Sequence, residues 1–202
     1  MGAWFSHIFT IISPMELMGM LLIFFMGYTI APFVIKLNHK IKMFTWLTRY
    51  AELMSRLLDE LLKKEWTFLP LFLFIFIFNL TSVFTGFLSG FIPYLPYLLL
   101  GYTGLNISLV LLLKDSEGNL LLNILNPVAL LEIPAICIAY TLSLKLKITS
   151  LSLLNIKLSA LTFQSLLPVM VLYPVLIFFI AALIETSLII SMRKMKAYLG
   201  ED

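Results

Sequence analysis

The chain has 202 residues, of which 61% are hydrophobic and only 12% are charged, and its formal net charge is +3. Soluble domains carry about 25% charged residues, so this composition excludes a soluble enzyme, a nucleic-acid-binding domain and a disordered tail. It indicates an all-α, polytopic membrane protein that contacts the lipid bilayer through apolar helices.

Long stretches without charge predict five membrane-spanning helices, because about 20 apolar residues cross the hydrocarbon core. The stretch from Trp66 to Leu113 is too long for one span. Its middle, Gly90 to Pro96, contains two prolines and predicts a turn between two helices. The five predicted spans within this single membrane domain are residues 15–35, 68–89, 97–113, 127–144 and 167–190.

Two further segments are amphipathic. In residues 37–66, apolar residues recur at spacings of three and four, which predicts a helix on the cytoplasmic side. This helix either lies at the membrane interface or docks against a second copy or another protein. Residues 148–164 alternate leucine with polar residues and predict an interfacial segment, helical or re-entrant. The apolar stripe of the first segment consists of Leu47, Tyr50, Met54, Leu57 and Leu61.

The positions of lysine and arginine predict the topology. With the N-terminus outside, eleven of these residues fall on the cytoplasmic side and three on the outer side. The positive-inside rule therefore predicts a multi-pass protein of the cell membrane with its C-terminus in the cytoplasm. A sixth crossing within residues 148–164 would instead move the C-terminus outside.

A few polar residues lie inside the predicted spans. A charged side chain at the centre of a span costs about 2.5–3.5 kcal/mol on insertion scales, so Glu132 and Glu185 are expected to face the protein interior. Pro134 frees a backbone carbonyl near Glu132. These carboxyl groups either bond a neighbouring helix or form part of an ion or solute site. Asn79 predicts a hydrogen bond between helices.

Glycines predict close helix packing at Gly86, Gly90, Gly101 and Gly104. No motif of a soluble enzyme is present. The two histidines and the single cysteine are isolated in the sequence, so we expect neither a metal site nor a cofactor.

Three blocks of sequence, in order, resemble the stage II sporulation protein M family. Pro127, Glu132, Pro134 and Ala135 match its central Pro-His-Gly-x-x-Glu-Leu-Pro-Ala pattern. Upstream, Asn79 and the four glycines resemble its hairpin, and downstream residues 180–185 resemble its last helix. Val128 and Ala129 replace the family's histidine and glycine, so any role of that histidine is absent here or is carried out differently.

The resemblance implies a membrane protein without enzymatic activity of its own. The sporulation member of the family acts with peptidoglycan-degrading partners, but relatives also occur in prokaryotes that do not form spores. We therefore expect a membrane scaffold that recruits partner proteins, as a homodimer or with other membrane proteins. The alternative is a small transporter or channel that uses Glu132 and Glu185. A third hypothesis is an intramembrane enzyme that uses the same two carboxyl groups.

Overall fold

The structure is a computed structural model that describes residues 12–42, 44–64, 66–114, 126–153 and 159–199. All regular secondary structure in this part of the chain is helical. Five helices are long and apolar enough to cross a membrane, which confirms the predicted all-α architecture with five spans. The helices are α2 (Pro14–Ile41), α3 (Thr45–Lys63), α4 (Phe68–Ser89), α5 (Leu95–Lys114), α7 (Pro127–Leu153) and α8 (Ser159–Leu199).

Helix α2 has a well-defined beginning and end. The side chain of Ser13 accepts from the backbone N–H of Glu16, and the Glu16 carboxylate accepts from the backbone N–H of Ser13. This capping box satisfies backbone donors that the first turn leaves free. The helix ends at Lys42, whose φ of 54° places it in the left-handed region. Helix α2 thus continues beyond the predicted limit at residue 35.

The predicted amphipathic helix over residues 37–66 is shorter in the structure, because its first residues complete α2. The backbone N–H of Phe44 and the hydroxyl of Thr45 both donate to the side-chain oxygen of Asn38. These bonds fix a short turn after Lys42, so that α3 begins only at Thr45 and folds back against α5.

The predicted interfacial segment over residues 148–164 does not form a separate element. Helix α7 continues past residue 144 to Leu153, and α8 begins at Ser159. Residues 154–158 lie outside the described residues. Between Pro134 and Leu153 the sequence contains no glycine or proline, so nothing in it terminates the helix at the predicted position.

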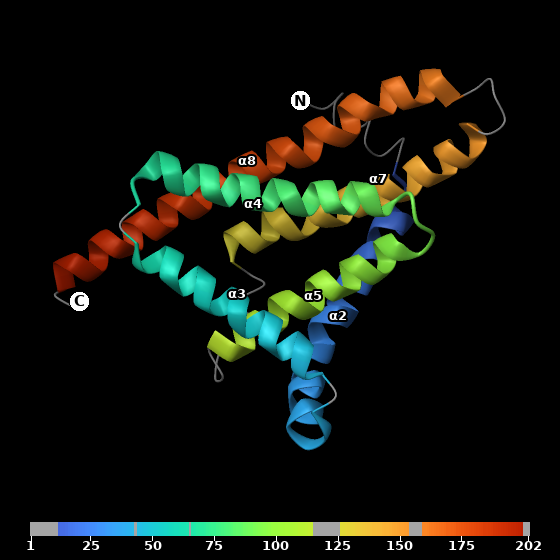
Figure 1. The fold of residues 1–202 in the computed structure, drawn as a ribbon. Helices are drawn as coiled ribbons and strands as arrows, with labels where there is room; N and C mark the ends of the chain where they lie inside the picture. Colours follow the sequence, from blue (N-terminus) through green and yellow to red (C-terminus); the bar gives the residue numbers. More distant parts are fainter. Residues whose placement is uncertain (1–11, 43, 65, 115–125, 154–158, 200–202) are drawn as a thin grey trace.

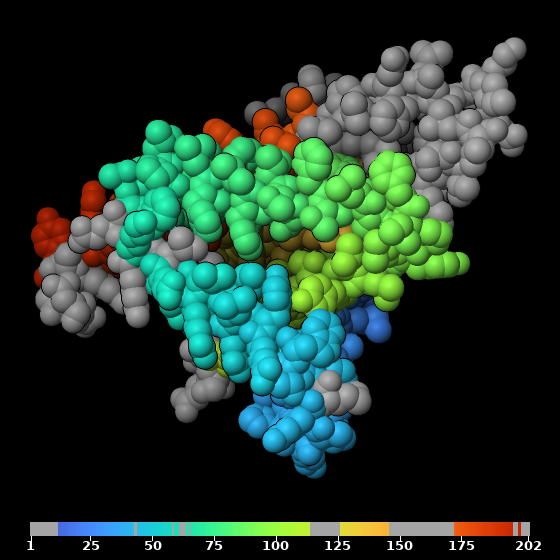
Figure 2. All heavy atoms as spheres, viewed as in Figure 1, coloured from blue at the N-terminus to red at the C-terminus, as the bar shows by residue number. Residues whose placement is uncertain are grey.

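The helices form two groups that share α7 (Figure 1). Helix α2 packs mainly against α5, and α3 also packs against α5. Helices α4, α7 and α8 pack together on the other side. Helix α7 contacts both groups and is the most buried of the five spans. Figure 2 shows α3 and α4 covering one face of the molecule, with α7 visible between them.

Candidate functional site

Three polar residues of the predicted spans meet where α4, α7 and α8 pack together. Asn79 on α4 donates a hydrogen bond from Nδ2 to Oε1 of Glu132 on α7, at 2.5 Å. Glu185 on α8 lies close enough to interact electrostatically with Glu132. All three side chains are partly buried. We call this group the polar seam.

The position of Glu132 follows from the local sequence of α7. Pro127 is the first residue of the helix, and the side chain of Asn126 accepts from the N–H of Val128 at 3.1 Å. Pro127 therefore begins the helix and is not part of the polar seam. Farther along, Pro134 has no N–H to donate to the carbonyl of Leu130. Helix α7 thus lacks one backbone hydrogen bond within one turn of the central carboxyl group of the seam.

The predicted glycines lie at helix contacts on both sides of α7. A Cβ on Gly86 would lie 3.2 Å from the ring of Tyr140, and one on Gly90 would overlap the backbone of Ser143. These two glycines therefore let α4 approach α7 closely.

The contact between α2 and α5 also depends on glycine. A Cβ on Gly104 would overlap the backbone of Phe24, whereas one on Gly101 would make ordinary contact with Ile23. Gly27, which was not among the predicted packing residues, faces Gly101 so closely that a Cβ would overlap its backbone. Gly27 belongs to no short glycine pair, but Gly27 and Ala31 are small residues four positions apart, a spacing that could have indicated this role.

The predicted docking stripe on α3 is only partly available to a partner. Leu47 is buried and packs with Ala31, Val34 and Leu109 of the same chain, so in this structure its side chain is not open to a partner. The short turn before α3 forces its first residues against α5. Tyr50 and Leu57 are exposed, and Met54 is half-buried. Leu61 lies in α3, but its side chain is outside the described part of the structure.

An ion pair that sequence reasoning missed joins α2 to α7. The ammonium group of Lys145 contacts the carboxylate of Glu16 beside a cavity of about 260 Å³. The predicted topology could have indicated this ion pair, because it places the two opposite charges on the same side of the membrane. The pair ties the beginning of the first span to the end of the fourth.

The polar seam holds an amide and two carboxyl groups, which can exchange hydrogen bonds between helices or bind a cation. In the part of the chain that the structure describes, no three His, Cys, Asp or Glu side chains come together as they would around a metal ion. Neither the Glu16–Lys145 cavity nor a larger groove between α2 and α5 is lined by Glu132 or Glu185.

A family model described as Stage II sporulation protein M matches residues 20–188 of the chain. The matched region contains Asn79, Glu132 and Glu185, the three residues of the polar seam. Comparison with curated proteins and with solved structures gives no match.

Proposed function

Because the chain belongs to the stage II sporulation protein M family, we propose that this membrane protein is a scaffold that positions partner proteins in the bilayer. The main support for the proposal is the Asn79–Glu132 hydrogen bond. In this bond the central carboxyl group of the seam helps to hold α4 against α7 and so has a structural role. Polar side chains that bond across a helix contact stabilise membrane bundles by about 0.6–2 kcal/mol. The proposal assigns neither a reaction nor a cofactor to the chain.

The exposed remainder of α3 is the surface proposed to meet the partner. Leu53 is 54% exposed and Leu57 is 43% exposed, although they lie on a helix that carries many charges. These two residues are neighbours on one face of the helix, and a contiguous apolar patch rimmed by polar residues is typical of a surface that contacts another protein or a membrane. The partner is another membrane protein or a second copy of this chain.

Site-specific photo-crosslinking in native membranes tests the scaffold role. A photoreactive amino acid at position 57 should give a discrete protein adduct, which Leu53→Glu in the same chain should abolish. The matched control carries the probe at position 33, where Phe33 is 72% exposed on α2 and should react mainly with lipid. Recovery of only monomer from the position-57 probe would overturn the proposal.

Transport is the second candidate, favoured by the interaction between Glu132 and Glu185 close to Pro134, which cannot donate a backbone hydrogen bond. Discontinuities of this kind in membrane helices form ion and substrate sites in transporters. The purified protein in liposomes should then carry protons or sodium down a gradient. Glu132→Gln, which retains an acceptor for Asn79, should reduce this flux, whereas flux equal to that of empty liposomes would exclude the transport role.

A further inference from the structure

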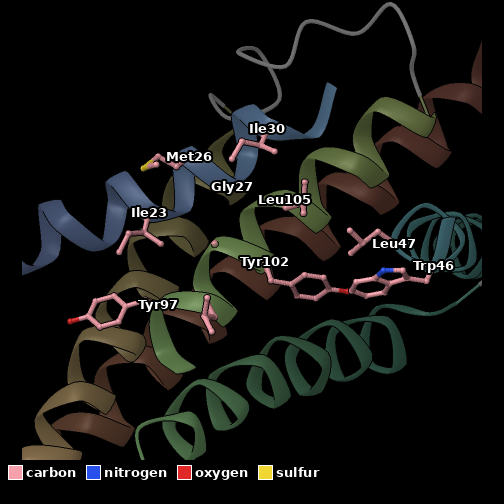
Figure 3. Close-up of a pocket in the computed structure, with 11 residues that line it drawn as sticks. Ile23, Met26, Gly27, Ile30, Trp46, Leu47, Tyr97, Tyr102 and Leu105 are labelled. Atoms are coloured by element: carbon pink, nitrogen blue, oxygen red, sulfur yellow. The ribbon is translucent and has the colours of Figure 1, made fainter. Parts of the chain in front are cut away.

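An apolar groove lies between α2 and α5 and is bordered by the beginning of α3 (Figure 3). Its volume is about 450 Å³. Cavities that bind small ligands have volumes of roughly 300–1,000 Å³. Its base is formed where Gly27 and Gly101 bring the two helices together. Its walls combine aliphatic side chains, including those of Met26, Ile30 and Leu98, with three aromatic ones.

The position of the groove indicates what could fill it. Helices α2 and α5 are both membrane spans, so the groove lies at the depth of the lipid hydrocarbon. Met26, Ile30 and Leu98 are each about half exposed or more, so their side chains are open to an occupant from the bilayer. A flexible chain of methylene groups matches such a long, apolar surface.

Aromatic rings lie in two places along the groove, with Tyr97 apart from Trp46 and Tyr102 (Figure 3). Trp46 at the beginning of α3 is 64% exposed, and Tyr102 on α5 points toward it (Figure 3). Tryptophan and tyrosine are enriched at the level of lipid headgroups, where their rings contact both hydrocarbon and polar groups. Trp46 therefore marks the end of the groove that faces the headgroups.

Two basic residues lie close to Trp46 in the sequence. Lys42 caps α2 four residues before Trp46, and Arg49 follows Trp46 by one turn on the same face of α3. Both side chains are exposed. The sequence from Lys36 to Ala51 contains no aspartate or glutamate. The rim of the groove is therefore complementary to an anionic headgroup.

We propose that the groove between α2 and α5 binds one acyl chain of an anionic phospholipid, with its phosphate against Lys42 and Arg49. This lipid site is independent of the proposed scaffold role, which rests on the polar seam and on the exposed part of α3. The lipid would fill the space beside Trp46 and stabilise the corner between α2 and α3.

Fluorescence quenching by brominated lipids tests the site, because bromine quenches only tryptophans that it contacts. The chain has three tryptophans, so Trp4→Phe with Trp66→Phe leaves Trp46 as the only probe. The protein is reconstituted in mixed vesicles in which either phosphatidylglycerol or phosphatidylcholine carries the bromine. We expect severalfold stronger quenching by phosphatidylglycerol at equal mole fraction, and equal quenching by the two lipids would overturn the proposal.

Trp66 provides a matched control, because Lys64 lies 4.9 Å from its ring but it does not line the groove. A chain with Trp66 as its only tryptophan should show a much weaker preference for phosphatidylglycerol. The same preference at Trp66 as at Trp46 would mean general attraction of anionic lipid to a basic surface, and would contradict a specific site.

Two pairs of substitutions separate the headgroup from the acyl chain. Lys42→Gln with Arg49→Gln should remove the preference for phosphatidylglycerol, whereas Lys194→Gln on α8 should preserve it. Met26→Phe with Ile30→Phe should fill the groove and reduce quenching of Trp46 by both lipids. A preference that survives the charge substitutions, or quenching that survives the filled groove, would overturn the proposal.

Discussion

At the scale of single residues, the side-chain amide of Asn79 donates a hydrogen bond to the carboxyl group of Glu132, which is partly buried. A buried acceptor without a partner costs about 1–3 kcal/mol, whereas replacing both partners by apolar groups can be nearly neutral. The Asn79–Glu132 hydrogen bond therefore matters for the stability of the bundle mainly because its loss would leave a buried carboxyl group without a donor.

Asn79→Leu should lower the thermal stability of the protein in detergent, by about 1–2 kcal/mol, because Glu132 loses its donor. Adding Glu132→Leu should restore part of the loss, since no unpaired carboxyl group then remains. Ser82→Ala, an exposed position on the same helix, serves as the control and should have little effect. Equal destabilisation by the single and the double substitution would contradict this account.

The glycines of α2 allow a second prediction, because Gly19 and Gly27 have opposite surroundings. A Cβ on Gly19 meets nothing within 4 Å, whereas one on Gly27 overlaps the backbone of Gly101. Gly27→Ala should therefore lower the thermal stability, by about 1–3 kcal/mol, as overpacking does. Gly19→Ala should be neutral or slightly stabilising, because alanine favours a helix. The prediction fails if thermal unfolding in detergent ranks the two variants alike.

The sequence predicts which residues of the polar seam matter but not how they combine. Asn79, Glu132 and Glu185 are conspicuous because each is costly in lipid, and this reasoning requires no knowledge of their neighbours. Their meeting depends on how α4, α7 and α8 pack, which spacing along the chain does not encode. Gly27 shows the same limit, because its partner Gly101 lies on another helix.

At the scale of elements, the turn between α2 and α3 decides how much of the amphipathic helix stays exposed. Periodicity predicts an apolar stripe from Leu47 onward, but it does not reveal which half of the stripe the protein itself covers. The side chain of Asn38 fixes which half of the stripe is covered, because it holds the beginning of α3 in place. It accepts from Phe44 and Thr45 and donates to Thr48 at 3.2 Å.

Asn38→Ala should loosen the beginning of α3, because three hydrogen bonds of the turn lose their partner. Each such hydrogen bond contributes about 0.5–1.5 kcal/mol net. Hydrogen exchange in detergent should show faster exchange of the backbone amides over residues 45–51, with α5 unchanged. His39→Ala, at the exposed neighbouring position, is the matched control. Unchanged exchange in Asn38→Ala would show that packing alone holds α3.

At the scale of the whole molecule, the five candidate spans among the described residues predict that the two ends of the bundle lie on opposite faces of the membrane. Charge counting predicts the outer face for the turn between α4 and α5, and the cytoplasmic face for the end of α8. Tyr94 in that turn and Tyr198 near the C-terminus are 76% and 91% exposed, so both positions are accessible to reagents.

The topology can be measured by labelling single cysteines, because Cys137 is the only native cysteine and is buried. In a Cys137→Ala background, a membrane-impermeant maleimide added to intact cells should label Tyr94→Cys. The same reagent should label Tyr198→Cys only after the cells are permeabilised. Labelling of both positions in intact cells would mean an even number of membrane crossings. The reversed pattern would mean that the protein has the opposite orientation in the membrane.

The length of helix α8 indicates how a partner protein could change the geometry of the polar seam. At 1.5 Å per residue, its 41 residues form a rod of about 60 Å, roughly twice the thickness of the hydrocarbon core. The apolar span within it, Leu172–Met195, covers 24 of these 41 residues. Pro168 and Pro174 lie between the beginning of α8 and Glu185, and prolines inside a helix favour a kink. A partner that binds the beginning of α8 would therefore move Glu185 relative to Glu132 by changing the bend at these prolines.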